Sequence, residues 1–154
     1  MIKTDHKRTV DITGECCTML EALMLAQAQE MSYELMHAKR ANNPQVFTLA
    51  LLAQVASSCA DLYGDVAKKY EAPSLANHFD KEWAVTGRVK HFMYQAEADY
   101  LHAMHLEPMA GAKFGEHLGH LRRAAATLQS KHKDVKLALS SLQKQYKVSP
   151  PSRC

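Results

Sequence analysis

The sequence has no apolar run long enough to cross a membrane and no C-x-x-C pair among its four cysteines. The longest mainly apolar stretch, residues 46–56, is far shorter than the roughly 20 residues that a membrane-spanning helix needs. Adjacent cysteines such as Cys16 and Cys17 rarely bond to each other, so the cysteines favour a reducing compartment. Asp11 stands where a secretory signal would need an apolar region. These absences predict a soluble, cytoplasmic protein.

The common catalytic signatures are absent as well. The sequence contains no G-x-x-x-x-G-K-[ST], G-x-G-x-x-G, G-x-S-x-G or H-E-x-x-H, the motifs of phosphate, dinucleotide, hydrolase and zinc-protease sites. Among the nine histidines, His102 and His105 lie one helical turn apart, as do His117 and His120. Because the usual enzyme motifs are missing, we expect no catalytic residue, no cofactor and no resident metal.

One enzyme class stays open, the four-helix bundle that holds two metal ions. Such bundles use Glu-x-x-His on two helices and one carboxylate from each of the two others. The candidate ligands in this chain are Glu34, His37, Asp61 or Asp65, Asp99, His102 and Glu116. Since one of the two histidine motifs has Asp in place of Glu, solvent-facing side chains are the simpler interpretation.

No segment alternates apolar and polar residues over the length of a strand, whereas apolar residues recur at helical spacing along most of the chain. The pattern predicts an all-α protein with helices over residues 15–40, 47–70, 80–106, 114–128 and 135–146. Short turns at Pro44, Pro73 and Pro108 make neighbouring helices antiparallel, either stacked in tetratricopeptide-like fashion or closed into a bundle. We expect a flexible lead-in over residues 1–14, a helical domain over 15–147 and a disordered tail over 148–154.

The helix over residues 47–70 is apolar on more than one face. Its first line is mostly small and consists of Leu49, Ala53, Ala56, Ala60, Tyr63 and Ala67. Its second line is bulkier and consists of Leu51, Val55, Cys59, Leu62 and Val66. This helix is therefore expected either to lie between two neighbours or to carry a spare apolar strip.

Charge is distributed unevenly along the chain. Residues 113–154 hold nine Lys and Arg against two acidic residues, a net charge of +7, while residues 1–112 hold ten against fourteen, a net charge of −4. The basic third suits an acidic protein tail or a peripheral contact with an anionic membrane, and solvated helix faces would explain it equally well. No stacking aromatics accompany its basic stripe, so we expect no nucleic-acid partner.

Residues 23–30, LMLAQAQE, resemble a segment of the Bro domain, the helical, tetratricopeptide-like module of Alix, rhophilin and their yeast relatives. Three further blocks, at residues 53–65, 83–100 and 114–124, resemble later helices of that domain in the same order. The resemblance covers less than half of the domain. It implies antiparallel helix pairs with tetratricopeptide-like stacking.

The resemblance also implies a function, that of a non-enzymatic adaptor. In this family an apolar patch receives the C-terminal amphipathic helix of an ESCRT-III filament subunit, which places the protein peripherally on endosomes. The patch positions match Leu51 and Val55, and an aromatic position matches Ser32 or, with a shift of one residue, Tyr33. Two alternatives remain: Leu51 and Val55 pack inside the protein, or the chain is a rhophilin-like signalling scaffold without ESCRT binding.

Overall fold

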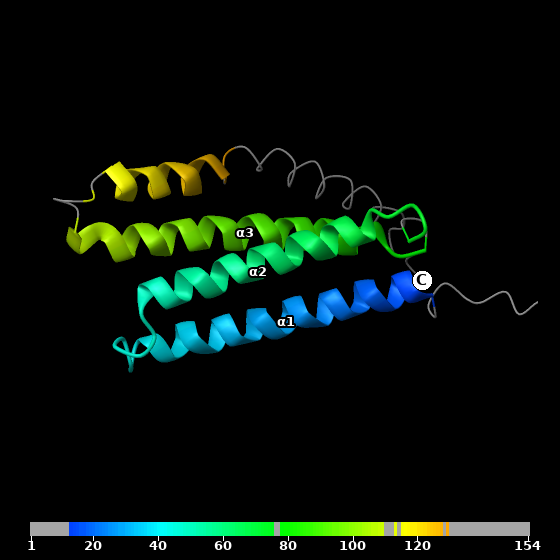
Figure 1. Ribbon diagram of the computed structural model, residues 1–154, viewed down its shortest axis with the longest axis horizontal. Coiled ribbons are helices and arrows are strands. Elements are labelled where there is room, and N and C mark those ends of the chain that lie inside the picture. The colour runs from blue at the N-terminus through cyan, green and yellow to red at the C-terminus, as the bar shows by residue number, and fades with distance from the viewer. Residues whose placement is uncertain (1–12, 76–77, 110–112, 114, 128, 130–154) are drawn as a thin grey trace, which may run out of the picture.

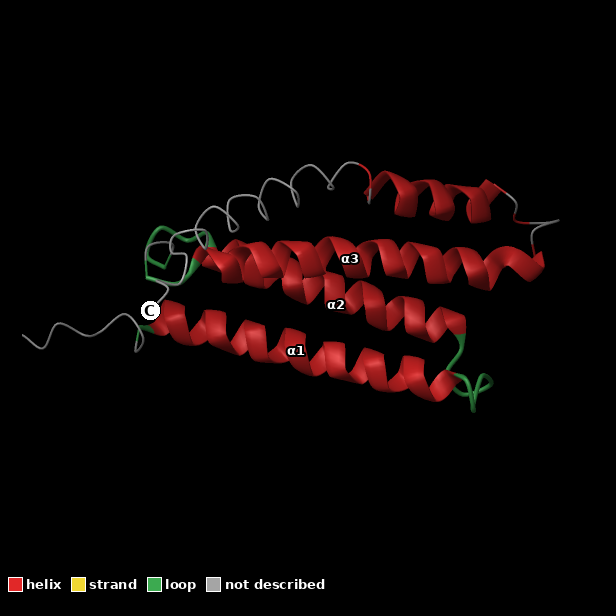
Figure 2. Cartoon of the chain, turned by 180° about the vertical axis from the view of Figure 1, so that it is seen from behind, coloured by secondary structure: helices red, strands yellow, loops and turns green. Residues whose placement is uncertain are grey.

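The computed structural model describes residues 13–75, 78–109, 113, 115–127 and 129 (Figures 1 and 2). Its elements are α1 (Gly14–Arg40), α2 (Leu49–Tyr70), α3 (Lys81–Leu106), the short 3-10 helix η2 (Glu107–Met109) and a helix over residues 115–127. No strand occurs within these residues. The prediction of an all-α protein is confirmed. Residues 1–12 of the predicted lead-in, the predicted tail and the helix over 135–146 lie outside the described residues, whereas Thr13 and Gly14, also placed in the lead-in, cap and begin α1.

Side-chain caps mark where the long helices begin. Thr13 and Thr48 accept hydrogen bonds from the backbone N–H groups of Cys16 at 3.3 Å and Leu51 at 3.2 Å. The carboxylate of Asp80 does the same for the N–H of Glu82 at 3.1 Å. Each cap satisfies a backbone donor that has no partner inside the helix, which fixes the starts of α1, α2 and α3.

The helices lie side by side in the order of the chain (Figure 1). Helix α2 packs against α1 on one side and against α3 on the other. The helix over residues 115–127 runs along α3, where Nδ1 of His117 lies 2.8 Å from the carbonyl oxygen of Ala103. Neighbouring helices are antiparallel. The helix α1 and the 115–127 helix stand at opposite ends of the row of stacked helices (Figures 1 and 2).

The small residues of α2 allow this close stacking. Five of the six residues in its line of mostly small residues are buried, with Ala53 and Ala56 fully inaccessible to solvent, and Leu49 is partly exposed. A Cβ atom added at Gly87 of α3 would lie 3.6 Å from the Cβ of Ala67, which is van der Waals contact distance, so the two helices approach closely there. The bulkier line of α2 is divided: Cys59 and Val66 are buried, while Leu51, Val55 and Leu62 are partly exposed.

Helical spacing did not distinguish the inner from the outer apolar residues of α1 and α3. In α1, Leu20 and Leu23 pack against the core, whereas three large apolar residues, Met24, Met31 and Leu35, are more than half exposed. In α3, the core residues are Tyr94, Ala98 and Leu101, while Trp83, Tyr100 and Met104 are exposed. Periodicity finds an apolar face, but only the folded chain shows whether a neighbour covers it.

Two further findings concern the membrane and the cysteines. None of the described helices is both long enough and apolar enough to cross a membrane. Cys17 and Cys59 are free thiols, and burial raises the pKa of the Cys59 thiol to about 11.

Candidate docking site

The predicted patch residues Leu51 and Val55 lie one turn apart on α2. Both side chains are partly exposed, and Val55 also packs against the buried cluster. Their spacing of four residues places them on the same face of the helix. The pair therefore combines a fixed position on the central helix with apolar surface that the described chain leaves partly uncovered.

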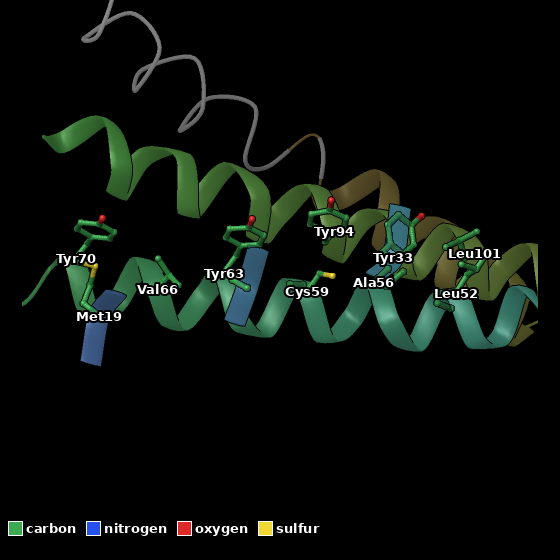
Figure 3. Packing of buried hydrophobic residues seen from close by; sticks show 14 of the residues in the cluster. Met19, Tyr33, Leu52, Ala56, Cys59, Tyr63, Val66, Tyr70, Tyr94 and Leu101 are labelled. Carbon is green, nitrogen blue, oxygen red and sulfur yellow. The ribbon is translucent and has the colours of Figure 1, made fainter. Parts of the chain in front are cut away.

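The two α1 positions considered for the aromatic contact have different surroundings. Ser32 is exposed, and its hydroxyl donates to the Ala28 carbonyl one turn earlier at 2.9 Å. Tyr33 is only 7% exposed and donates a hydrogen bond of 2.9 Å to the carboxylate of Glu97 on α3. Burial, followed by that carboxylate, raises the pKa of Tyr33. Its ring also meets the edge of Tyr94, with centroids 5.5 Å apart (Figure 3).

A groove lies between α1 and α3, and residues of α2 line the first of its two cavities. One cavity of about 310 Å³ has Leu23 and Gln27 of α1 on one wall and Trp83 and Lys90 of α3 on the other. A second cavity of about 370 Å³ lies between Tyr33 and His37 of α1 and Met93, Tyr94 and Glu97 of α3. Tyr33 thus belongs to this groove, and neither Leu51 nor Val55 lines either cavity.

A carboxylate inside the groove joins all three long helices, and sequence reasoning did not find it. Glu30 of α1 accepts hydrogen bonds from Lys90 Nζ at 2.7 and 2.5 Å and from the Tyr94 hydroxyl at 2.9 Å, both on α3. The Tyr63 hydroxyl of α2 donates to the same carboxylate. Lys90 also stands 5.1 Å from the centroid of the Tyr63 ring, a cation–π contact.

The surroundings of Glu30 keep it charged. Burial alone would raise the pKa of this carboxyl, but the hydrogen bonds from Lys90, Tyr63 and Tyr94 outweigh burial and hold the pKa below its usual value. The sequence did contain a sign of this inward carboxylate. Glu30 is the last residue of LMLAQAQE and follows Leu23 by seven positions, which places both on the same inward face of the helix. The octapeptide thus places both the fully buried Ala26 and the central carboxylate of the helix row.

A second polar cluster joins α3 to the 115–127 helix. The carboxylate of Asp99 lies 2.9 Å from Nδ1 of His120 and accepts a hydrogen bond of 3.2 Å from Nε of Arg123. The rings of His102 and His120 are stacked with centroids 5.1 Å apart. Burial, followed by the charge of His120, lowers the pKa of His102. This cluster fixes the last described helix against α3.

The candidate ligands of the di-metal alternative do not converge. Glu34 and His37 line the second cavity of the groove, whereas Asp61 and Asp65 line a separate hollow between α2 and α3. Glu116 is exposed on the 115–127 helix. Within the described part of the chain, no group of three His, Cys, Asp or Glu side chains is placed to hold a metal ion.

Comparisons with known proteins point to one family. The model of the BRO1-like domain matches residues 1–149 of this chain. Similar relatives include the ALG-2 interacting protein X of Dictyostelium discoideum, 29% identical over 95% of this chain and 18% of its own length. The Vacuolar-sorting protein BRO1 of Arabidopsis thaliana is 30% identical over 87% of this chain and 15% of its own length. The human Programmed cell death 6-interacting protein is 30% identical over 79% of this chain and 13% of its own length.

No solved structure gives a significant match. The chain spans less than a fifth of the length of the curated relatives that it matches. The match to the domain nevertheless covers nearly the whole chain and agrees with the resemblance of the four sequence blocks. The chain therefore belongs to the BRO1-like domain family, as the resemblance of its sequence blocks predicts.

Proposed function

We propose that this chain docks the C-terminal amphipathic helix of an ESCRT-III filament subunit and thereby acts on endosomes. The observation that carries the proposal is the pair Leu51 and Val55, which lie one turn apart on the central helix and keep part of their apolar surface exposed. Anchors at this spacing are what a helix laid along another helix meets. The name of the Arabidopsis relative, a vacuolar-sorting protein, agrees with a role in endosomal transport.

The packing of the site supports this assignment. Covering the exposed parts of Leu51 and Val55 would contribute about 1 kcal/mol each, because burial of apolar surface is worth roughly 25 cal/mol per Å². Tyr33 offers little free surface, so its part is to hold α1 against α3 through Glu97, and Ser32 supplies an exposed polar edge. In this proposal Leu51 and Val55 are the two apolar anchors of the site.

The test is a titration of the full chain with fluorescently labelled C-terminal helices of ESCRT-III subunits, followed by anisotropy. Leu51→Asp and Val55→Asp are each expected to abolish binding, because a carboxylate would be buried without a partner. Ser57→Asp is the matched control, since Ser57 is exposed on the same helix and lies outside the pair Leu51 and Val55. Circular dichroism checks that helix content is unchanged.

Two outcomes would contradict the proposal. Unchanged affinity in both Leu51→Asp and Val55→Asp would exclude these residues as the docking surface. Absence of binding by the wild-type chain to every ESCRT-III helix tested would instead support the rhophilin-like scaffold without ESCRT contact.

A further inference from the structure

An apolar seam runs along the outer face of α1. We define this outer seam by five residues at alternating spacings of four and three: Met24, Ala28, Met31, Leu35 and Ala38. All five are exposed, and the three large side chains are 55%, 63% and 55% exposed in sequence order. The spacing is that of the contact positions of a coiled coil, in which one stripe faces a partner helix.

The outer seam points away from α2, and its last residue, Ala38, also borders the cavity between α1 and α3. The buried residues Ala26 and Tyr33 hold α1 against the rest of the protein. Each lies two positions from two members of the outer seam, which is about 200° around a helix. Since α1 is the first helix of the row, no described residue stands beyond it (Figures 1 and 2). A continuous apolar stripe left open in this way is characteristic of an interaction surface.

We propose that the outer seam is the dimer interface of this chain, formed when α1 of a second copy lies antiparallel on it. Side-chain size supports this pairing. With Met31 at the two-fold axis, Met24 of one copy meets Ala38 of the other, and Ala28 meets Leu35. Every layer off the axis then combines one large and one small side chain, which is the packing that fills the space between two helices.

Charge selects the antiparallel direction. Two exposed charged residues lie along the same edge of the outer seam, Glu21 in the first half of α1 and Lys39 in its last turn. An antiparallel pair with Met31 at the axis places Glu21 of each helix beside Lys39 of the other, whereas a parallel pair would place Glu21 beside Glu21 and Lys39 beside Lys39. The resulting interface is two-fold symmetric, so each copy uses the same surface. This inference is independent of Leu51 and Val55.

The test is the mass of the full chain in solution, measured by light scattering and sedimentation across a concentration series. The wild type is expected to be dimeric. Met31→Glu is expected to weaken the dimer by about 100-fold or more, because two carboxylates would face each other in an apolar layer. Met93→Glu is the matched control, since Met93 is 47% exposed on α3 and lies outside the outer seam.

Cysteine cross-linking tests the direction of the pair. In a Cys17→Ser, Cys154→Ser background, Met31→Cys is expected to give a disulfide-linked dimer on mild oxidation, because the two residues meet at the axis. Met24→Cys alone is expected to stay uncross-linked, whereas Met24→Cys together with Ala38→Cys is expected to cross-link. A wild type that is monomeric up to about 100 µM would overturn the proposal, since a specific dimer is tighter than that. A dimer that Met31→Glu leaves intact, or that Met31→Cys fails to cross-link, would overturn it as well.

Discussion

Replacing Glu30 by alanine is expected to destabilise the fold more than any other single removal of a charge on α1. The side chain is 12% exposed and accepts hydrogen bonds from Lys90, Tyr94 and Tyr63. Its loss would leave the ammonium of Lys90, 32% exposed, without its carboxylate, and would leave two hydroxyl groups without their acceptor. Breaking a fully buried ion pair costs roughly 3–5 kcal/mol; since Lys90 is partly solvated, we expect a loss of about 3 kcal/mol.

The assay is urea-induced unfolding of the full chain followed by circular dichroism. Glu34→Ala is the control, because Glu34 lies one turn later on α1 and is exposed; a change of about 0.5 kcal/mol or less is expected there. Combining Glu30→Ala with Lys90→Ala should cost less than the sum of the two single changes, with a coupling of about 1–2 kcal/mol. A Glu30→Ala protein as stable as the wild type would refute the view that this carboxylate joins the three helices.

Three further outcomes are expected, each with its own measurement. Gly64→Ala should lower the free energy of unfolding by about 1 kcal/mol, despite the better helix propensity of alanine. The added Cβ would lie 3.0 Å from Nδ1 of His91, and that ring cannot move away easily because its Nδ1 lies 2.7 Å from the Ala60 carbonyl oxygen. Gly119→Ala has open space and should instead gain about 0.5 kcal/mol; equal effects in urea titrations would contradict the close contact. The pKa of His102 is lowered in the folded protein, so protonation of this residue favours the unfolded state. Stability should therefore fall as the pH drops below 6.5, the ordinary pKa of histidine. In His102→Gln the melting temperature should change less between pH 7 and pH 5.5 than it does in the wild type. The pKa of Glu30 is also lowered in the folded protein, and its effect falls at more acidic pH. The contribution of Glu30 to stability is present above 4.5, its ordinary pKa, and is lost as the pH falls through the folded pKa. The melting temperature of Glu30→Gln should therefore fall less on acidification than that of the wild type.

Local signals in the sequence were sufficient to place the helices. Pro44 and Pro73 lie in the turns that separate α1, α2 and α3, and the line of small residues on α2 marked the face where its neighbours pack. Both signals depend on residues close together in the chain, which is why they could be interpreted without a structure.

The parts that sequence did not predict depend on distant residues. Glu30 meets Lys90 and Tyr94 sixty or more positions away, and no periodicity indicates that a charged residue will point inward toward them. The outward direction of Met31 depends on α2 and α3 both contacting α1 from its opposite side. The matched patch residues Leu51 and Val55 were located from the family resemblance, and their role in docking stays a prediction.

The most direct test of the adaptor account is the affinity of the full chain for an ESCRT-III C-terminal helix, compared with that of Leu51→Asp. The account predicts saturable binding by the wild type and none by the variant, with equal helix content in both proteins. Equal affinities would show that the helix docks elsewhere, and the assignment of Leu51 would then be wrong.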